Sequence, residues 1–290
     1  MQGRTLSWNQ GYLKVELGLE EGGSGASLVL LPALSSICTK GEMRPLGERL
    51  AADFHVRSVD WPGFGGLPRP RAHWSAPVLS AYLRWLLEEA LSPPHMIVAA
   101  GHAATYALAL CAARPGLITR LVLVAPTWRG PLPTMMGGQR PWFATLRSLF
   151  DNPIVGPVLY RLNVSAPVVR HMAREHVYQQ PQWLQGARLQ AKLAVTRVRG
   201  ARHASVRFVS GALDAVGSRA QWLALAGQVD IPVLQVYGEH TPRRSRAEME
   251  SLAQLPSVRS VRLAHGRLAV HEEYPDEVAA AVLPFLRGST

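Results

Sequence analysis

Several side chains capable of acid, base or nucleophilic chemistry stand directly after apolar runs of the sequence. The run at residues 96–100 is followed by Gly-His-Ala-Ala-Thr at 101–105, and the run at 231–238 by Glu-His-Thr at 239–241. If these runs are parallel strands, the residues after them meet at one edge of a sheet, where such folds bind ligands. Nucleophilic catalysis there needs a hydroxyl or thiol, an imidazole that takes its proton, and a carboxylate that orients the imidazole.

Hydrophobic periodicity predicts strands that alternate with helices at both ends of the chain. The predicted strands cover residues 12–19, 27–31, 54–59, 96–100, 121–124, 231–238 and 258–263. The predicted helices cover residues 41–52, 78–90, 104–113, 245–253 and 276–287. Such alternation is typical of an α/β fold, with a mostly parallel sheet covered by helices on both faces.

The alternation breaks after Pro126. Proline and glycine cluster at residues 130–138, and irregular helical stretches run to about Gly227. We expect a helical cap at residues 127–229, inserted into an α/β core made of residues 1–126 and 230–290. A length of 290 residues suits one core with an insertion better than two independent domains.

Three short motifs stand in a consistent order on the predicted elements. Asp-Trp-Pro-Gly-Phe-Gly at 60–65 follows a strand, the 101–105 segment occupies a strand-to-helix turn, and Glu-Tyr-Pro at 273–275 precedes the last helix. They resemble the D-x-P-G-x-G, G-x-S-x-G and E-x-P segments of the α/β-hydrolase superfamily. The resemblance covers nearly the whole chain and implies a central sheet of the α/β-hydrolase type with an inserted cap.

The resemblance also implies where a catalytic triad would stand. The nucleophile position corresponds to Ala103, the acid position to Thr241 and the histidine position to Leu268. None of these side chains can perform the role of its position. Because loss of the nucleophile and its base lowers the rate by several orders of magnitude, we expect a degenerate triad.

Four other side chains are candidates to substitute for the triad. Cys38 falls in the loop that would shape the oxyanion hole, where a thiolate could attack a carbonyl. His240 and His265 follow predicted strands, and His271 stands close to the Glu-Tyr-Pro segment. The alternative interpretation is an inert, half-buried cysteine and histidines with structural roles.

A pocket at the sheet edge is expected even without the triad. By the resemblance, its oxyanion region corresponds to the backbone N–H of Leu34 and to His102, Ala103 and Ala104. A small hydrophobic ligand would suit such a pocket.

The positive charge of the chain is concentrated in the predicted cap. Of the formal net charge of +11, residues 127–229 carry +10, from twelve arginines and Lys192 against three acidic residues. A local positive field attracts an anionic membrane surface or an acidic protein partner, and Arg197, Arg199 and Arg202 are the candidate contacts. Nucleic acid is the least favoured partner, because no known recognition module is present. The alternative is that these arginines face water or pair with carboxylates elsewhere.

Composition excludes several classes of protein. A hydrophobic content of 48% and a mean hydropathy of +0.03 exclude an acidic, disordered chain. No apolar run approaches the ~18 residues of a transmembrane helix, and the first residues do not resemble a signal peptide. We therefore expect a cytoplasmic protein, peripheral to a membrane if the cap binds one. With only Cys38 and Cys111, a disulfide framework or cysteine-based metal site is not expected, and neither is a metal or cofactor.

Two functions fit these observations. The first is a catalytically degenerate α/β-hydrolase-fold protein that binds a ligand or an anionic partner through its basic cap and residual pocket. The second is a hydrolase of unusual mechanism that acts on an ester, thioester or small amide, using water activated by His240 or His265, or using Cys38. The missing triad favours the first function, and the remaining histidines and acids at the sheet edge favour the second.

Overall fold

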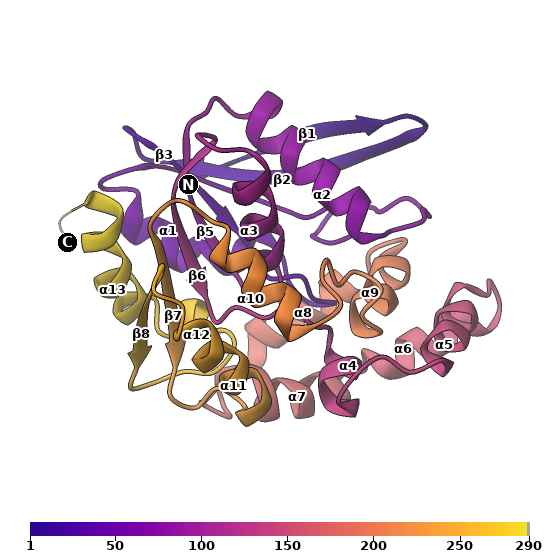
Figure 1. Cartoon of the computed structure of the whole chain (residues 1–290). Coiled ribbons are helices and arrows are strands. Elements are labelled where there is room, and N and C mark those ends of the chain that lie inside the picture. Colours follow the sequence, from indigo (N-terminus) through magenta and orange to yellow (C-terminus); the bar gives the residue numbers. More distant parts are fainter. Residues whose placement is uncertain (289–290) are drawn as a thin grey trace.

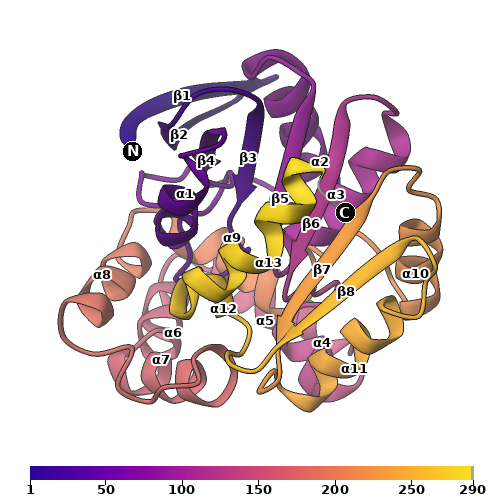
Figure 2. The ribbon, with the colours of Figure 1, turned by 90° about the vertical axis from the view of Figure 1, so that its left-hand side faces the viewer.

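An eight-stranded sheet runs through the molecule in the order β1-β2-β4-β3-β5-β6-β7-β8 (Figures 1 and 2). The computed structural model describes residues 1–288. β1 pairs antiparallel with β2, and β2 antiparallel with β4, whereas all other neighbours pair in parallel. The predicted fold class, a mostly parallel sheet of the α/β-hydrolase type with helices on both faces, is confirmed.

The strands are short, except for the first two. Their bounds are β1 Gln2–Gln10, β2 Leu13–Gly22, β3 Ser27–Leu31, β4 His55–Val59, β5 His95–Ala100, β6 Ile118–Val124, β7 Val233–Gly238 and β8 Val258–Leu263. Every residue of β5 and β7 is buried, which explains why these strands are mostly apolar in sequence.

The helices fall into those that cover the sheet and those that follow β6. The first set is η1 Lys40–Met43, α1 Arg44–Leu50, α2 Ala76–Trp85, η2 Leu86–Ala90, α3 Ala103–Ala113, α10 Arg219–Gly227, α11 Arg243–Leu252, α12 Val270–Glu273 and α13 Pro275–Arg287. The second set is α4 Pro131–Met136, α5 Trp142–Asp151, α6 Val155–Asn163, α7 Ala166–Met172, η3 Ala173–Val177, α8 Gly186–Thr196 and α9 Ala201–Val209. Within residues 1–288, no helix is both long enough and apolar enough to span a membrane.

Two apolar layers cover the sheet, one on each face. α1 and α13 pack on one face through leucine, valine and phenylalanine side chains, whereas α2, α3 and α10 pack on the other (Figure 1). α3 is buried on nearly all sides, so the segment that follows β5 lies at the centre of the molecule.

Strand β1 is the one strand that the periodicity of the sequence does not predict. It lies at the edge of the sheet and only Trp8 among its residues is buried, so its apolar signal is weak. The Trp8 ring packs edge-on against Tyr82 of α2, with 5.3 Å between ring centroids. This contact fixes the edge strand to the helix layer.

The helices α4 to α9 form a cap with an apolar cluster of its own. That cluster includes Phe150, Tyr160 and Leu193, and it meets the core at Ala269. α10 differs from the other helices after β6, because it contacts α3 and α11, and its Trp222 belongs to the main core. We therefore place the end of the cap near residue 210, before the boundary at 229 that the sequence suggests.

Replacing Trp222 by alanine tests this placement of α10. Trp222 is fully buried, so we expect Trp222→Ala to lower the free energy of unfolding by about 3–5 kcal/mol. Trp142, in α5, is 46% exposed, and Trp142→Ala should change stability by only about 0.5 kcal/mol. Urea unfolding of the two variants gives the comparison, and equal losses would contradict a core position for α10.

Candidate functional site

The turn between β5 and α3 is made by Gly101. Its φ is +52°, and its N–H donates to the carbonyl of Val124 on β6 at 2.9 Å. Ala103 is the first residue of α3 and is fully buried. Since a nucleophile elbow holds its nucleophile on the strained strand-to-helix turn, the turn geometry points to Gly101, two residues before the position assigned from the motif. Neither residue has an atom that can attack a carbonyl.

The loop after β3 leaves little room for a side chain at this turn. A Cβ added to Gly101 would lie 3.1 Å from the Cβ of Ala33, which is closer than ordinary van der Waals contact. The expected oxyanion residues Leu34, His102 and Ala104 are at most 1% exposed. None of them lines the cavity on the cap, which is bordered by α7, η3 and α8, or the cavity between α2 and α3.

The other two expected triad positions are buried or partly buried. Thr241 is buried in the loop after β7, and its hydroxyl has no hydrogen-bond partner within the described residues. Leu268 packs against Ala125, Tyr237 and Met249. The positions that would hold the acid and the base of a hydrolase are therefore part of the packing of the sheet edge.

Neither Cys38 nor His271 is suited to replace a triad residue, because Cys38 is held as a thiol and His271 is buried. Burial, together with the carboxylate of Glu42, raises the pKa of the Cys38 thiol well above its usual range, so the thiolate is disfavoured. His271 is 1% exposed, and burial lowers its pKa to about 4. Both of its ring nitrogens lack a hydrogen-bond partner within residues 1–288.

His240 and His265 lie at the outer surface. His240 is exposed, and only its backbone N–H is held, by the carbonyl of Gly266 at 3.2 Å. The Nδ1 atom of His265 lies 2.8 Å from Oε1 of Glu277 on α13, and its ring stacks on Tyr274. No hydrogen bond in the described part of the chain joins any of the four candidate substitutes to another.

A buried pair of titratable groups, His102 and Asp214, lies beside the Gly101 turn. His102 Nε2 is 3.2 Å from the carbonyl oxygen of Leu213 and 3.3 Å from Oδ1 of Asp214, and Asp214 also accepts from the N–H of Gly130 at 2.9 Å. Burial lowers the pKa of His102 to about 4 and raises that of Asp214 to about 7. Between these values both side chains are largely neutral, so the pair attaches the segment after α9 to the start of α3 without a buried ion pair.

A buried ionic cluster also attaches the cap to the core. Lys192 Nζ lies 2.6 Å from Glu42 and 3.1 Å from Glu272, and the hydroxyl of Tyr178 donates to Glu272 at 2.7 Å. Burial opposes the charge of Lys192, but the two carboxylates and Tyr178 together raise its pKa. A sequence signal exists for this cluster, since Lys192 is the one lysine among the thirteen basic residues of the predicted cap.

The sequence model described as the alpha/beta hydrolase family matches residues 28–281. A search of curated protein sequences finds no match.

Solved structures with the same fold include three kinds of enzyme. They are a thermophilic esterase from Thermogutta terrifontis (TM-score 0.74, 15% identity, 99% of each chain covered), a bromoperoxidase from Bacillus anthracis (0.72, 14%, 98% of this chain and 100% of that one) and a haloalkane dehalogenase loop variant from Bradyrhizobium elkanii (0.72, 18%, 99% and 97%). At these identities the similarity shows the fold alone.

The opposite pKa shifts of Asp214 and His102 predict a specific dependence of stability on pH. The raised pKa of Asp214 stabilises the folded state below about pH 4, and this contribution is lost as the pH rises to about 7. The lowered pKa of His102 acts in the opposite direction, because it destabilises the fold as the pH falls from 6.5 to about 4. In Asp214→Asn only the first effect is removed, so we expect its stability relative to the parent to increase between pH 4 and 7, by up to about 4 kcal/mol.

Urea unfolding at several pH values measures this change, and Asp276→Asn is the control. The pKa of Asp276 is lowered by its hydrogen bond to Arg49, so its contribution should stay constant above about pH 4. A flat difference for Asp214→Asn as well would contradict a raised pKa for Asp214.

Proposed function

The chain belongs to the alpha/beta hydrolase family, and we propose that it is a member without serine-triad catalysis that binds an anionic membrane surface through its cap. Gly101, Thr241 and Leu268 occupy the triad positions in this proposal. The observation that carries the membrane part is a set of exposed apolar side chains on the cap helices.

Nine of the ten large hydrophobic side chains that are exposed within residues 1–288 lie on the cap. We call this set the cap apolar surface: Met135, Met136, Trp142, Leu149, Ile154, Val155, Val158, Leu162 and Val168. The tenth, Tyr12, lies outside the cap, in the hairpin between β1 and β2. Such a concentration is unusual on the surface of a soluble protein and is typical of a membrane or partner site.

Helix α6 contributes the most exposed part of this surface. Val155, Val158 and Leu162 follow one face of the helix and are 42%, 58% and 64% exposed, and Ile154 directly before the helix is 80% exposed. Figure 1 shows α5 and α6 at the outer end of the cap, away from the sheet. Apolar side chains on the outer helices can enter the boundary between headgroups and acyl chains.

The arginines of the cap supply charge complementary to anionic lipid. Five of the thirteen basic side chains between residues 127 and 229 form ion pairs: Arg129, Arg174, Lys192, Arg207 and Arg219. The other eight have no carboxylate within 4.0 Å in the described part of the chain: Arg140, Arg147, Arg161, Arg170, Arg188, Arg197, Arg199 and Arg202. Arginine next to exposed apolar side chains favours a membrane surface over water as the surroundings of the cap.

Of the three arginines proposed from the sequence, two remain simple candidates for membrane contact. Arg197 and Arg199 are exposed, whereas Arg202 is partly buried and its Nε donates to the carbonyl of Phe150 at 3.0 Å. Replacement of Arg202 would therefore disturb the cap as well as its charge. Arg197 and Arg199 are the better pair for a charge test.

The alternative function, hydrolysis by an unusual mechanism, is supported by no arrangement of the candidate side chains in the described part of the chain. Cys38 is held as a thiol, His240 and His265 face outward, and His271 is enclosed with no hydrogen-bond partner for its ring among residues 1–288. Catalysis by these residues would need a rearrangement of the sheet edge.

The non-catalytic part of the proposal predicts no esterase activity. Hydrolysis of p-nitrophenyl acetate by the purified protein should equal that of a heat-treated control, and Ala103→Ser and Gly101→Ser should be equally inactive because neither hydroxyl gains a base. A turnover that disappears in Cys38→Ser or His240→Ala would instead identify a substitute catalytic residue.

The membrane part predicts binding to vesicles that depends on both apolar contact and charge. Vesicles of phosphatidylcholine with phosphatidylserine should bind the protein, and binding should weaken between about 0.1 M and about 1 M salt as the Debye length falls from about 10 Å to about 3 Å. Leu162→Glu should weaken binding about tenfold or more, since an inserted leucine contributes about 1.5–3 kcal/mol. The double replacement of Arg197→Glu with Arg199→Glu should also weaken vesicle binding relative to the parent, and the effect should be largest at low salt.

The matched control is Tyr12→Glu, which changes an exposed hydrophobic side chain outside the cap. It should leave vesicle binding unchanged. Equal binding to vesicles with and without phosphatidylserine would refute an anionic membrane contact by the cap, and so would equal losses of binding in Leu162→Glu and Tyr12→Glu. If the protein binds acidic proteins in a salt-sensitive way but does not bind vesicles, the partner is a protein.

A further inference from the structure

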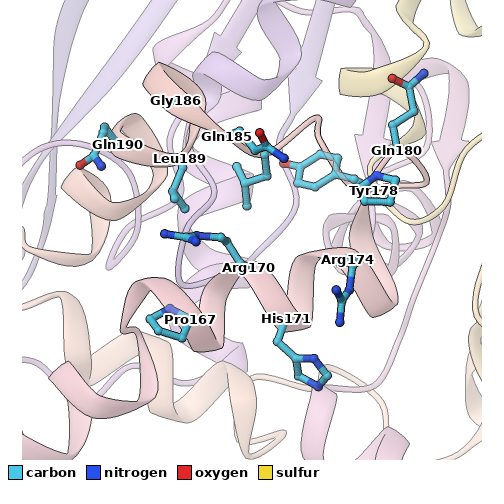
Figure 3. A pocket seen from close by; sticks show the side chains of 12 residues that line it. Pro167, Arg170, His171, Arg174, Tyr178, Gln180, Gln185, Gly186, Leu189 and Gln190 are labelled. Carbon is cyan, nitrogen blue, oxygen red and sulfur yellow. The ribbon is translucent and has the colours of Figure 1, made fainter.

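A cavity of about 800 Å³ opens on the cap, apart from the Gly101 turn (Figure 3). It lies between the helical stretch α7–η3 and the segment that leads from Tyr178 into α8. None of the residues that line it belongs to the triad or oxyanion positions. Its volume is in the range of small-molecule sites.

The floor of the cavity is apolar and rigidly held. Tyr178, Leu184 and Leu189 are at most 4% exposed and belong to the apolar cluster of the cap. The Tyr178 ring stacks on Trp183, with 4.1 Å between centroids, and its hydroxyl donates to Glu272 of the core. The floor is therefore in place before any ligand arrives.

The rim of the cavity is positively charged and contains no carboxylate. Arg170 and Arg174 stand one helical turn apart, and Figure 3 shows Arg170 extended toward Leu189, above the floor. Arg170 has no ion-pair partner within residues 1–288, and Arg174 has only the adjacent, half-exposed Glu175. A surface pair of that kind contributes little, so the rim keeps its positive charge. Figure 3 shows Arg174 directed away from Leu189, so Arg170 is the arginine that can bind an anion over the floor.

Nearby carboxylates do not compete for these arginines. Glu272 is engaged by Lys192 and Tyr178, and Glu273 accepts from the N–H groups of Gln179 and Gln180 at 2.8 and 2.7 Å. The remaining polar groups at the rim include the side chains of Gln185 and Gln190, which can donate to an anion or accept from its hydroxyl.

We infer that this cavity binds an anionic amphiphile, a molecule with an apolar chain and one phosphate or carboxylate group. The chain lies on Leu184, Leu189 and the Tyr178 ring, and the anionic group is bound by Arg170, since guanidinium forms paired hydrogen bonds with phosphate and carboxylate oxygens. Arg174 adds to the positive charge of the rim. The inference goes beyond the proposed membrane contact, because the ligand can be a soluble amphiphile as well as a lipid of a bilayer.

Calorimetric titration with monomeric decyl phosphate in the absence of vesicles tests the site. We expect saturable binding by the full chain, and weaker binding of inorganic phosphate and of decanol, each of which has only half of the recognised chemistry. Arg170→Ala should weaken decyl phosphate binding about tenfold or more, the effect of one lost charge-assisted hydrogen bond. The affinity of Arg170→Lys for decyl phosphate should lie between those of Arg170→Ala and the parent, because lysine keeps the charge but cannot form paired hydrogen bonds.

Arg161→Ala is the matched control, because Arg161 is an exposed cap arginine outside the cavity. It should bind decyl phosphate like the parent. Equal affinities of Arg170→Ala and the parent, or equal binding of decanol and decyl phosphate, would overturn the assignment.

A second titration identifies the source of the ligand. If vesicles containing phosphatidic acid bind the parent, lose binding in Arg170→Ala and are displaced by decyl phosphate, the ligand is a membrane lipid; if only the monomer binds, it is a soluble amphiphile. Leu162→Glu should leave the titration with decyl phosphate unchanged, so a failure of the membrane proposal is distinguishable from a failure of this one.

Discussion

The ammonium group of Lys192 is the charge on which the attachment of the cap depends. A buried cation is tolerated only with opposite charges around it, and here Glu42 of η1 and Glu272 of α12 provide them. Because these carboxylates belong to the core and the lysine to α8, the cap has one favourable position over the sheet edge. Removal of the ammonium would leave two buried carboxylates unpaired, at a cost of about 3–5 kcal/mol.

This attachment has a consequence for the chemistry of the site. Glu42 and Glu272 are acids close to Cys38 and His271, yet their charge is used by Lys192, and the Glu42 carboxylate favours the thiol form of Cys38. At the Gly101 turn, Asp214 similarly serves the junction with the cap. The polar groups that remain at the sheet edge therefore stabilise the position of the cap, whereas Leu268 and Ala103 stabilise the edge by packing.

Most of the fold can be predicted from the sequence, because buried parallel strands consist mostly of apolar residues, as in β3, β5 and β7. β1 is missed because an exposed edge strand has little apolar signal. The site is harder to predict, because a sequence motif gives only the spacing of residues, whereas a nucleophile elbow is defined by its backbone conformation. The left-handed φ falls on Gly101, whereas the motif points to Ala103. The pairing of His102 with Asp214 joins residues 112 positions apart, which no local pattern contains.

The position of the apolar side chains separates two roles within the cap. Leucine, tyrosine and valine residues that face inward, such as Leu193, Tyr160 and Val169, form the cluster that gives the cap its shape. Ile154, Val158 and Leu162 face outward, so they do not contribute to that cluster and gain little stabilisation from burial. Lysine or glutamate in place of Val158 and Leu162 would keep α6 and be better hydrated, since both are good helix formers. The proposed membrane contact would cover the apolar residues at the outer end of the cap, and the cap arginines that have no carboxylate partner within residues 1–288 favour an anionic surface.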